Sequence, residues 1–403
     1  MGTLEVEISL PPDLHRSFGQ NTVKTLLVRL FYPTTASSGS RPSWTGPGND
    51  TIQGYSTFLG VNPTLLRVAS YLGLKWTKIP AYTNAPLMAR PTTADSSGTK
   101  WPCCIFSHGL GGTRNAYSQI SGSIASGGLV VMSIEHRDNS AAISVQKYED
   151  EKAQVIEYVS IKESNASTLK KRREQMAQRA YEVKLGVELF RAMEDKSSAS
   201  TKTFSPTYWT RLGEKLNKFQ GHLDAGSGRL IMAGHSMGAA TAVHVCKDDG
   251  ATQLPSSTKD YKLQSEFRAA ILLDPWMEVL VDSTSKPLTQ PTLAVASEAF
   301  HNWSGNWNNV VQLMKGRSKL NRLAWLTDSA HLSQSDFQLL FPTATKYAFK
   351  AKISPDIAMD RNVRLVRDFL REAVGLIVPL GKDGMGKESG DVWKEEEVKS
   401  YSL

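Results

Sequence analysis

The apolar residues of this chain fall into short continuous runs that are separated by longer helical or polar segments. Continuously apolar strands are typical of a sheet that is buried on both faces. Such runs lie at 24–32, 101–107, 129–134, 230–233, 269–273, 292–296 and 322–327. Strands that alternate with helices in this way predict the α/β class, with a mostly parallel sheet and helices on both faces.

One amphipathic segment lies early in the chain, between residues 63 and 76. Asn62 and Pro63 offer an N-cap and a first-turn proline for a helix. Its apolar members are Leu65, Leu66, Val68, Ala69 and Leu72, with Arg67, Lys75 and Trp76 among them. Two interpretations stay open: the helix packs on the domain, or its apolar surface covers the active site or contacts a membrane.

The remaining segments outline the domain. Residues 145–196 are long, polar and partly helical, and the charge run 170–173 indicates a solvated helix face. Residues 360–374 form an amphipathic helix. From Lys382 onward the chain is rich in Gly, Lys and Glu, which predicts disorder. We therefore expect one catalytic domain, 1–381, and a disordered tail, 382–403.

Composition narrows the classes of function. The chain has 403 residues and a net charge of +8, but no zinc-ligand spacing, RNA-binding signature or phosphate-binding loop, so we expect no nucleic-acid partner. The N-terminus lacks the pattern of a signal peptide, and Val6 stands where a myristoylation signal needs Ser or Thr. No apolar run is long enough to span a membrane, and three cysteines make no disulfide framework. These features predict a cytoplasmic protein.

The strongest chemical motif is Gly234-His-Ser236-Met-Gly238, which follows an apolar run and precedes a segment compatible with a helix. A serine in this context lies on a sharp strand-to-helix turn, where small neighbours let the strand and helix approach. The hydroxyl then stands at the top of the sheet, and the N–H of Met237 points toward a developing oxyanion. Ser236 is the predicted nucleophile, with a tight structural turn as the alternative.

Two further segments follow earlier strands. His108-Gly-Leu110-Gly-Gly is where hydrolases with such a turn place the second oxyanion donor, so the backbone N–H of Leu110 is our candidate. The alternative is a glycine turn without a ligand. Residues 135–138, Glu-His-Arg-Asp, are interpreted as a buried, salt-bridged corner rather than as reacting groups.

Ser236, Asp274 and His331 each follow a strand, in the order Ser, Asp, His that α/β-hydrolases use. A serine hydroxyl needs a base to take its proton, and the base needs a carboxylate to fix its tautomer. His331 is the predicted base because the terminal strand normally delivers it, and His301 is the alternative. Asp274 is the predicted acid, and Asp328 is its alternative.

Five segments together resemble the platelet-activating-factor acetylhydrolase family, in its plasma and type II intracellular branch. They are Phe-Ser-His-Gly-Leu-Gly (106–111), Glu-His-Arg-Asp (135–138), Gly-His-Ser-Met-Gly-Ala-Ala-Thr (234–241), Leu-Asp-Pro-Trp-Met (273–277) and His-Leu-Ser-Gln-Ser-Asp-Phe (331–337). The similarity extends from about Leu26 to Leu376. Ala239 and Pro275 depart from the family's usual residues, and neither change removes a catalytic group.

The resemblance implies an α/β-hydrolase fold with Ser236 as nucleophile, Asp274 as acid and His331 as base. It implies oxyanion donors at Leu110 and Met237, and an amphipathic surface at 63–76. The expected activity is calcium-independent phospholipase A2 hydrolysis of short or oxidised sn-2 acyl chains, with phospholipid as substrate and neither metal nor cofactor. A soluble carboxylesterase or polyester hydrolase is one alternative. A lipid-surface binding protein without turnover is another.

Overall fold

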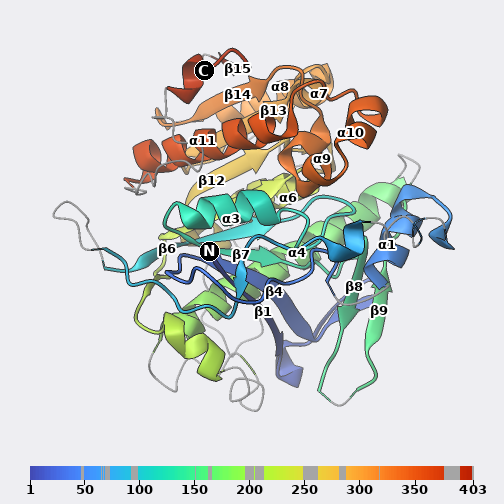
Figure 1. Ribbon diagram of the computed structural model, residues 1–403, viewed down its shortest axis with the longest axis vertical. Coiled ribbons are helices and arrows are strands. Elements are labelled where there is room, and N and C mark those ends of the chain that lie inside the picture. The colour runs from blue at the N-terminus through green and yellow to red at the C-terminus, as the bar shows by residue number, and fades with distance from the viewer. Residues whose placement is uncertain are drawn as a thin grey trace.

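The computed structural model of the chain (Figure 1) describes residues 1–46, 50–64, 66, 68, 73–91, 99–149, 151–161, 166–195, 204, 213–247, 262–280, 287–316, 318–375 and 391–401. Within these ranges, eleven strands form one sheet in the order β15-β14-β13-β12-β11-β6-β7-β4-β1-β5, with β10 beside β6. The strands are β1 Gly2–Ser9, β4 Thr25–Tyr32, β5 Tyr82–Thr83, β6 Trp101–Ser107, β7 Val130–Ile134, β10 Leu223–Asp224, β11 Leu230–His235, β12 Phe267–Leu273, β13 Thr292–Ser297, β14 Arg322–Leu326 and β15 Val398–Tyr401. Two hairpins lie outside the sheet: β2 Arg16–Phe18 with β3 Asn21–Val23, and β8 Ile143–Gln146 with β9 Gln154–Glu157.

The centre of the sheet is parallel. Strands β7, β6, β11, β12, β13 and β14 run in one direction, while β4 and β15 pair antiparallel to their neighbours. The central strands are buried along nearly their whole length, as expected for a sheet covered on both faces. Because the carboxyl ends of parallel strands share one edge, the loops after β6, β11, β12 and β14 meet there.

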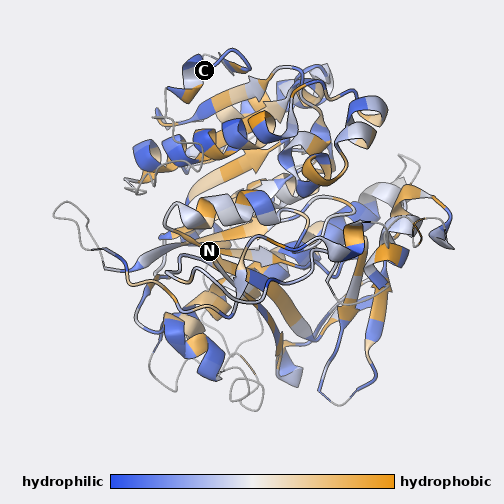
Figure 2. Cartoon of the chain, in the orientation of Figure 1, coloured by the Kyte–Doolittle hydropathy of each residue, from blue (hydrophilic) through white to orange (hydrophobic). Residues whose placement is uncertain are grey.

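Helices cover both faces of the sheet. They are α1 Asp50–Leu59, α3 Ser118–Ser126, α4 Ala166–Glu194, α6 Met237–Lys247, α7 Glu298–His301, α8 Ser304–Met314, α9 Asp336–Leu340, α10 Pro342–Ala348 and α11 Pro355–Val374. Apolar residues of α4, α6 and α8 pack on one face, and those of α3 and α11 pack on the other. In Figure 2 the strands of the central sheet are largely apolar. The predicted α/β-hydrolase architecture is confirmed.

The expectation of a disordered tail from residue 382 is wrong for residues 391–401. Strand β15 pairs with β14, from Leu326 opposite Val398 to Leu323 opposite Tyr401. Val392 and Val398 are buried in the core layer that contains α11. Charged tail residues also have partners, since Arg361 of α11 contacts Glu395 and Glu397. Composition suggested disorder, but a few well-spaced apolar residues and matched charges fix this segment at the sheet edge.

Parts of the predicted 63–76 helix lie outside the described residues, among them Leu65, Arg67, Ala69 and Leu72. In the part that is described, Val68 is 58% exposed, and Trp76, in a 3-10 turn from Leu74 to Trp76, is 67% exposed. No helix within the described ranges has the length and apolar character that crossing a bilayer requires.

Helix α4 corrects the interpretation of the charge run 170–173. Lys170, Lys171 and Arg173 are exposed as expected, but Arg172 is buried. The helix also buries Arg179, Glu182 and Lys184. The helical spacing of its buried positions is not visible as an apolar pattern in the sequence, because the buried face mixes apolar and charged residues.

Candidate active site

Ser236 lies on the sharp turn between β11 and α6. Its φ is 57°, a left-handed conformation that is uncommon outside glycine. The glycines on either side are required by space: a β-carbon at Gly234 would lie 2.2 Å from the carbonyl oxygen of Gly238, and one at Gly238 would lie 2.0 Å from that of Ser107. The turn is tied to β12, because Ser236 N–H donates to Leu273 O at 2.9 Å. The predicted turn is present.

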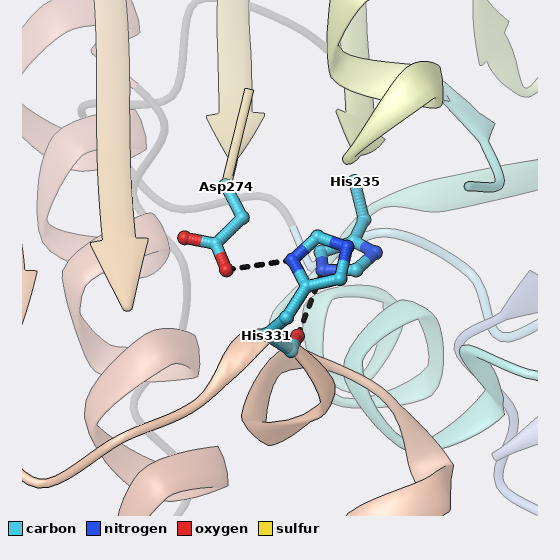
Figure 3. Close-up of side chains that lie close together, drawn as sticks. All are labelled: His235, Asp274 and His331. Carbon is cyan, nitrogen blue, oxygen red and sulfur yellow. Dashed lines mark hydrogen bonds and ion pairs between the residues drawn. The ribbon is translucent and has the colours of Figure 1, made fainter. Parts of the chain in front are cut away.

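Asp274 and His331 lie at the neighbouring strand ends and contact each other (Figure 3). His331 Nδ1 donates to Asp274 Oδ2 at 2.9 Å. Asp274 is fully buried and also accepts hydrogen bonds from the hydroxyl and backbone N–H of Ser297. This carboxylate therefore fixes one tautomer of His331 and leaves Nε2 as the nitrogen able to accept a proton.

The Ser236 hydroxyl makes no hydrogen bond to His331 or to any other described residue. Such contacts are often long without substrate and tighten when it binds. The trio remains close through the backbone, because Ser236 is bonded to Leu273, the residue before Asp274, and accepts from Trp276 N–H at 3.3 Å. The structure thus joins Asp274 to His331 directly, and joins Ser236 to the segment that carries Asp274.

The alternative residues lie elsewhere. The His301 ring stacks on Trp325 with centroids 4.2 Å apart, and its Nδ1 contacts Asn302. Asp328 is exposed and lies 3.7 Å from Lys352. Within the described part of the chain, neither belongs to a hydrogen-bonded imidazole–carboxylate pair, whereas His331 and Asp274 form one, so the geometry favours His331 and Asp274.

Two rings enclose the His331 imidazole. Phe300 stacks on one face with centroids 4.3 Å apart, and His235 lies on the other at 4.4 Å. The roles of Phe300 and Ser297 could not be read from the sequence, because Ser297, at the end of β13, and Phe300, in α7, carry no motif of their own. Only the folded sheet places the junction of β13 and α7 against His331.

A chain of hydrogen bonds joins the Gly109 loop to the base. Gly109 N–H donates to Tyr117 Oη at 3.2 Å, Tyr117 lies 2.8 Å from His235 Nδ1, and His235 Nε2 lies 3.0 Å from the carbonyl oxygen of His331. An amide can only donate and a carbonyl can only accept, so Tyr117 donates to Nδ1 and His235 donates from Nε2. Burial, with a smaller contribution from His331, holds the pKa of His235 well below its usual range. His235 is therefore neutral at neutral pH.

The candidate oxyanion donors lie beside Ser236. A β-carbon at Gly109 would lie 2.9 Å from Cβ of Ser236, so the loop that carries Leu110 adjoins the turn. Gly111 N–H donates to Ser140 O at 2.8 Å and anchors that loop. The backbone N–H groups of Leu110 and Met237 have no hydrogen-bond partner among the residues described. Met237 begins α6, where the helix dipole favours negative charge.

Residues 135–138 form the buried, salt-bridged corner that the sequence predicted. Arg137 contacts Glu7 at 2.7 Å, Asp138 contacts Arg179 at 2.7 Å, and Arg114 contacts Glu135 at 3.1 Å. Although burial opposes its ionisation, Arg179 lowers the pKa of Asp138 to about 2. Arg179 Nη1 also donates to His108 O at 2.7 Å, so the corner supports the strand end that precedes Leu110.

His136 and Glu182 complete this corner as a neutral pair. His136 Nδ1 lies 2.6 Å from Glu182 Oε2, and both side chains are buried. Burial raises the pKa of Glu182 to about 8 and lowers that of His136 well below its usual range. The contact is thus a hydrogen bond from a protonated carboxyl to a neutral imidazole.

His235, Asp274 and His331 are also the described residues whose ligand atoms are close enough to hold a metal, within 4.8 Å of one another. Their groups already satisfy each other, since Asp274 Oδ2 accepts from His331 and Ser297, and His235 Nε2 donates to the His331 carbonyl. The arrangement fits an imidazole–carboxylate pair that acts on a neighbouring hydroxyl.

Comparison with known proteins gives a consistent result. The chain is 28% identical to "Putative phospholipase A2" of Schizosaccharomyces pombe, over 92% of this chain and 90% of that protein. It is 27% identical to platelet-activating factor acetylhydrolase of Cavia porcellus, over 88% of this chain and 74% of that protein. A ferulic acid esterase from Streptomyces cinnamoneus shares the fold, with a TM-score of 0.60 and 16% identity, covering 100% of this chain and 96% of that one.

The family described as platelet-activating factor acetylhydrolase, isoform II, matches residues 15–389, which is nearly the whole chain. This match shows that the chain belongs to that family and is a hydrolase of esters.

Proposed function

We propose that this protein cleaves the sn-2 ester of phospholipids that carry a short or oxidised acyl chain, with Ser236, His331 and Asp274 as its catalytic triad. The observation that carries the proposal is the Asp274–His331 hydrogen bond at the strand edge where Ser236 occupies a left-handed turn. The family and the names of its relatives support a phospholipid as the ester.

The reaction follows from the positions of the groups. His331 Nε2 accepts the proton of the Ser236 hydroxyl as Oγ attacks the sn-2 carbonyl carbon. The N–H groups of Leu110 and Met237 donate to the oxygen on which negative charge develops, a contribution that can reach about 3 kcal/mol per donor. Protonated His331 then gives its proton to the departing lysophospholipid oxygen. Water, deprotonated by His331, releases the acyl group from Ser236.

We also propose that the exposed apolar residues at 59–76 contact the lipid surface from which the substrate is taken. Leu59, Val61, Val68 and Trp76 are each at least 43% exposed. An enzyme that takes its substrate from a lipid aggregate must bind the surface of that aggregate, and exposed apolar residues can do so. Lys75 adds a positive charge beside them.

The test is hydrolysis of a matched pair of substrates by the wild-type protein. One is a phosphatidylcholine with an sn-2 acetyl group, and the other is p-nitrophenyl butyrate. We expect turnover of both, loss of both after treatment with a fluorophosphonate, and labelling of Ser236. Turnover of p-nitrophenyl butyrate without any of the phospholipid would contradict the proposal and favour a general carboxylesterase.

A further inference from the structure

Arg172 is a buried cation without a carboxylate partner. Its residue surface is 6% exposed, and its polar contact within the described chain is from Nη1 to Gln175 Oε1 at 2.8 Å. The other buried arginines all have an acidic partner: Arg29 with Glu5, Arg114 with Glu5 and Glu135, Arg137 with Glu7, and Arg179 with Asp138. A buried charge is costly unless it is paired, so a lone guanidinium indicates that its partner is a ligand.

The guanidinium lies beside the loop that carries Asp274. Its central carbon is 5.4 Å from the ring centroid of Trp276, whose backbone N–H donates to Ser236 O. The indole Nε1 of Trp276 is buried and has no hydrogen-bond partner among the residues described. A guanidinium without a carboxylate partner and an indole N–H without a hydrogen-bond partner within the described chain therefore meet at Trp276, whose backbone is bonded to Ser236.

The direction of α4 places Arg172 near the edge of the sheet where the carboxyl ends of the parallel strands meet. Near the C-terminal end of α4, Glu194 contacts Lys100, just before β6 begins. Arg179 contacts the carbonyl of His108, just after β6 ends. Arg172 lies two helical turns further, or about 10 Å, on the same side of the helix. Arg172 therefore lies beyond the C-terminal end of β6, at the edge of the sheet where Ser236 lies.

Aromatic residues continue from Arg172 to the other side of the site. Burial lowers the pKa of Arg172, while its neighbours Tyr158 and, more weakly, Asp138 act to raise it. The Tyr158 ring contacts Phe58 edge-on at 4.9 Å, and Phe58 lies against Gly111, where a β-carbon would meet the ring at 2.4 Å. Arg172 therefore lies between the loop of Trp276 and the loop of Leu110.

We propose that Arg172 and the Trp276 indole N–H form a subsite for the phosphodiester of the substrate. This inference rests on the proposed phospholipase function and names the groups that recognise the phosphate. A phosphodiester carries one negative charge on two free oxygens, which the guanidinium fork can bind bidentately while the indole supplies a third donor. In a glycerophospholipid the phosphate is attached to the carbon next to the sn-2 ester, so an anion site close to Ser236 has suitable placement.

The experiment compares two soluble substrates with the same acyl chains, dihexanoylphosphatidylcholine below its micellar concentration and dihexanoylglycerol. For Arg172→Gln we expect kcat/KM for the phospholipid to fall about 10- to 100-fold, the usual effect of losing hydrogen bonds to a charged group. The fall on the diglyceride should be at least tenfold smaller than on the phospholipid. Arg172→Lys should keep part of the phospholipid activity, and Trp276→Phe should show a smaller loss with the same preference.

Lys171→Gln, which removes an exposed charge from the adjacent position, is the matched control and should leave both activities unchanged. The melting temperature of Arg172→Gln should be equal to or above that of the wild type, because the variant removes an unpaired buried charge. Equal losses on both substrates, or no loss on the phospholipid, would overturn the subsite.

One further comparison separates the phosphate from another anion of oxidised lipids. If Arg172→Gln lost activity only when the sn-2 acyl chain ended in a carboxylate, the phosphodiester assignment would be wrong. If the wild type itself failed to cleave dihexanoylphosphatidylcholine, the proposed function would fail first. If the wild type cleaved dihexanoylphosphatidylcholine and Arg172→Gln did so equally well, only the subsite proposal would be wrong.

Discussion

His235 donates a hydrogen bond from Nε2 to the backbone carbonyl of His331 at 3.0 Å, while the two rings stack 4.4 Å apart. The residue before the candidate nucleophile therefore fixes the segment that carries the candidate base, His331. Through Tyr117, the same ring is bonded to the backbone of Gly109, the neighbour of Leu110. One buried, neutral histidine thus links His331 and the loop of Leu110 to the turn of Ser236.

The first prediction tests this chain of hydrogen bonds. Tyr117→Phe leaves the ring in place but removes the donor to His235 and the acceptor for Gly109 N–H. We expect kcat to fall about tenfold, the effect of one lost hydrogen bond, with little change in KM. Tyr32→Phe is the control: it also removes a buried tyrosine hydroxyl, bonded to Ala85 O at 2.8 Å, but far along the sheet. Equal turnover of Tyr117→Phe and Tyr32→Phe would show that the hydrogen bonds through Tyr117 do not position His331.

The second prediction concerns the triad. Ser236→Ala and His331→Ala should each reduce kcat by roughly 10⁴- to 10⁶-fold, and the double variant should lose little more, because the residues act as a unit. The measurement is turnover of p-nitrophenyl butyrate. His301→Ala is the matched control, since that ring stacks on Trp325 and does not contact Asp274. Near-wild-type turnover of His331→Ala, with loss in His301→Ala, would move the base to His301.

Much of the fold and the main candidate residues could be predicted because they follow local rules. The strands at 101–107 and 230–235 are largely apolar runs, and the glycine at 234 is required by a local contact with Gly238, although Gly238 itself is required by the distant Ser107 carbonyl. Order along the chain was enough to nominate Asp274 and His331, since parallel strand ends share one edge.

The rest depends on contacts between distant segments. The tyrosine at 117 acquires its role only because it faces His235, 118 residues later. Arg172 looked like part of a solvated charge run, and its burial follows from how α4 lies across the strand ends. The strand at 398–401 has a tail-like composition and is ordered by the edge of β14.

The third prediction concerns Val68 and Trp76, two of the exposed apolar residues proposed to contact lipid. Val68→Ser with Trp76→Ser should weaken binding to phosphatidylcholine vesicles by about 10- to 100-fold, since each apolar side chain contributes roughly 1.5–3 kcal/mol when fully removed from water. Because both residues are exposed, the melting temperature should change little. Hydrolysis of p-nitrophenyl butyrate should also be retained.

Vesicle sedimentation and thermal unfolding measure the two effects separately. Tyr401→Ser, which removes an exposed aromatic residue at the opposite edge of the sheet, should leave vesicle binding intact. A large fall in melting temperature, with parallel loss of both activities, would instead assign Val68 and Trp76 to packing against the domain.

The fourth prediction is a pH dependence of stability that originates at Glu182. Burial raises the pKa of this carboxyl from its usual 4.5 to about 8 in the folded protein. The group therefore favours the fold fully below pH 4.5, and this contribution is lost as the pH rises toward 8, because the unfolded chain releases the proton first. Glu182→Gln mimics the protonated carboxyl: its amide can donate to His136 and its oxygen can accept from Gln178 and Arg137 N–H.

The variant should consequently gain stability over the wild type as the pH rises from 5 to 8, by up to about 1.4 kcal/mol per pH unit. Urea unfolding at several pH values measures this difference. Glu157→Gln, at an exposed carboxylate, is the matched control and should give a constant offset. If the curves of Glu182→Gln and the wild type ran parallel from pH 5 to 8, Glu182 would be ionised in the fold. Its contact with His136 would then be a buried ion pair.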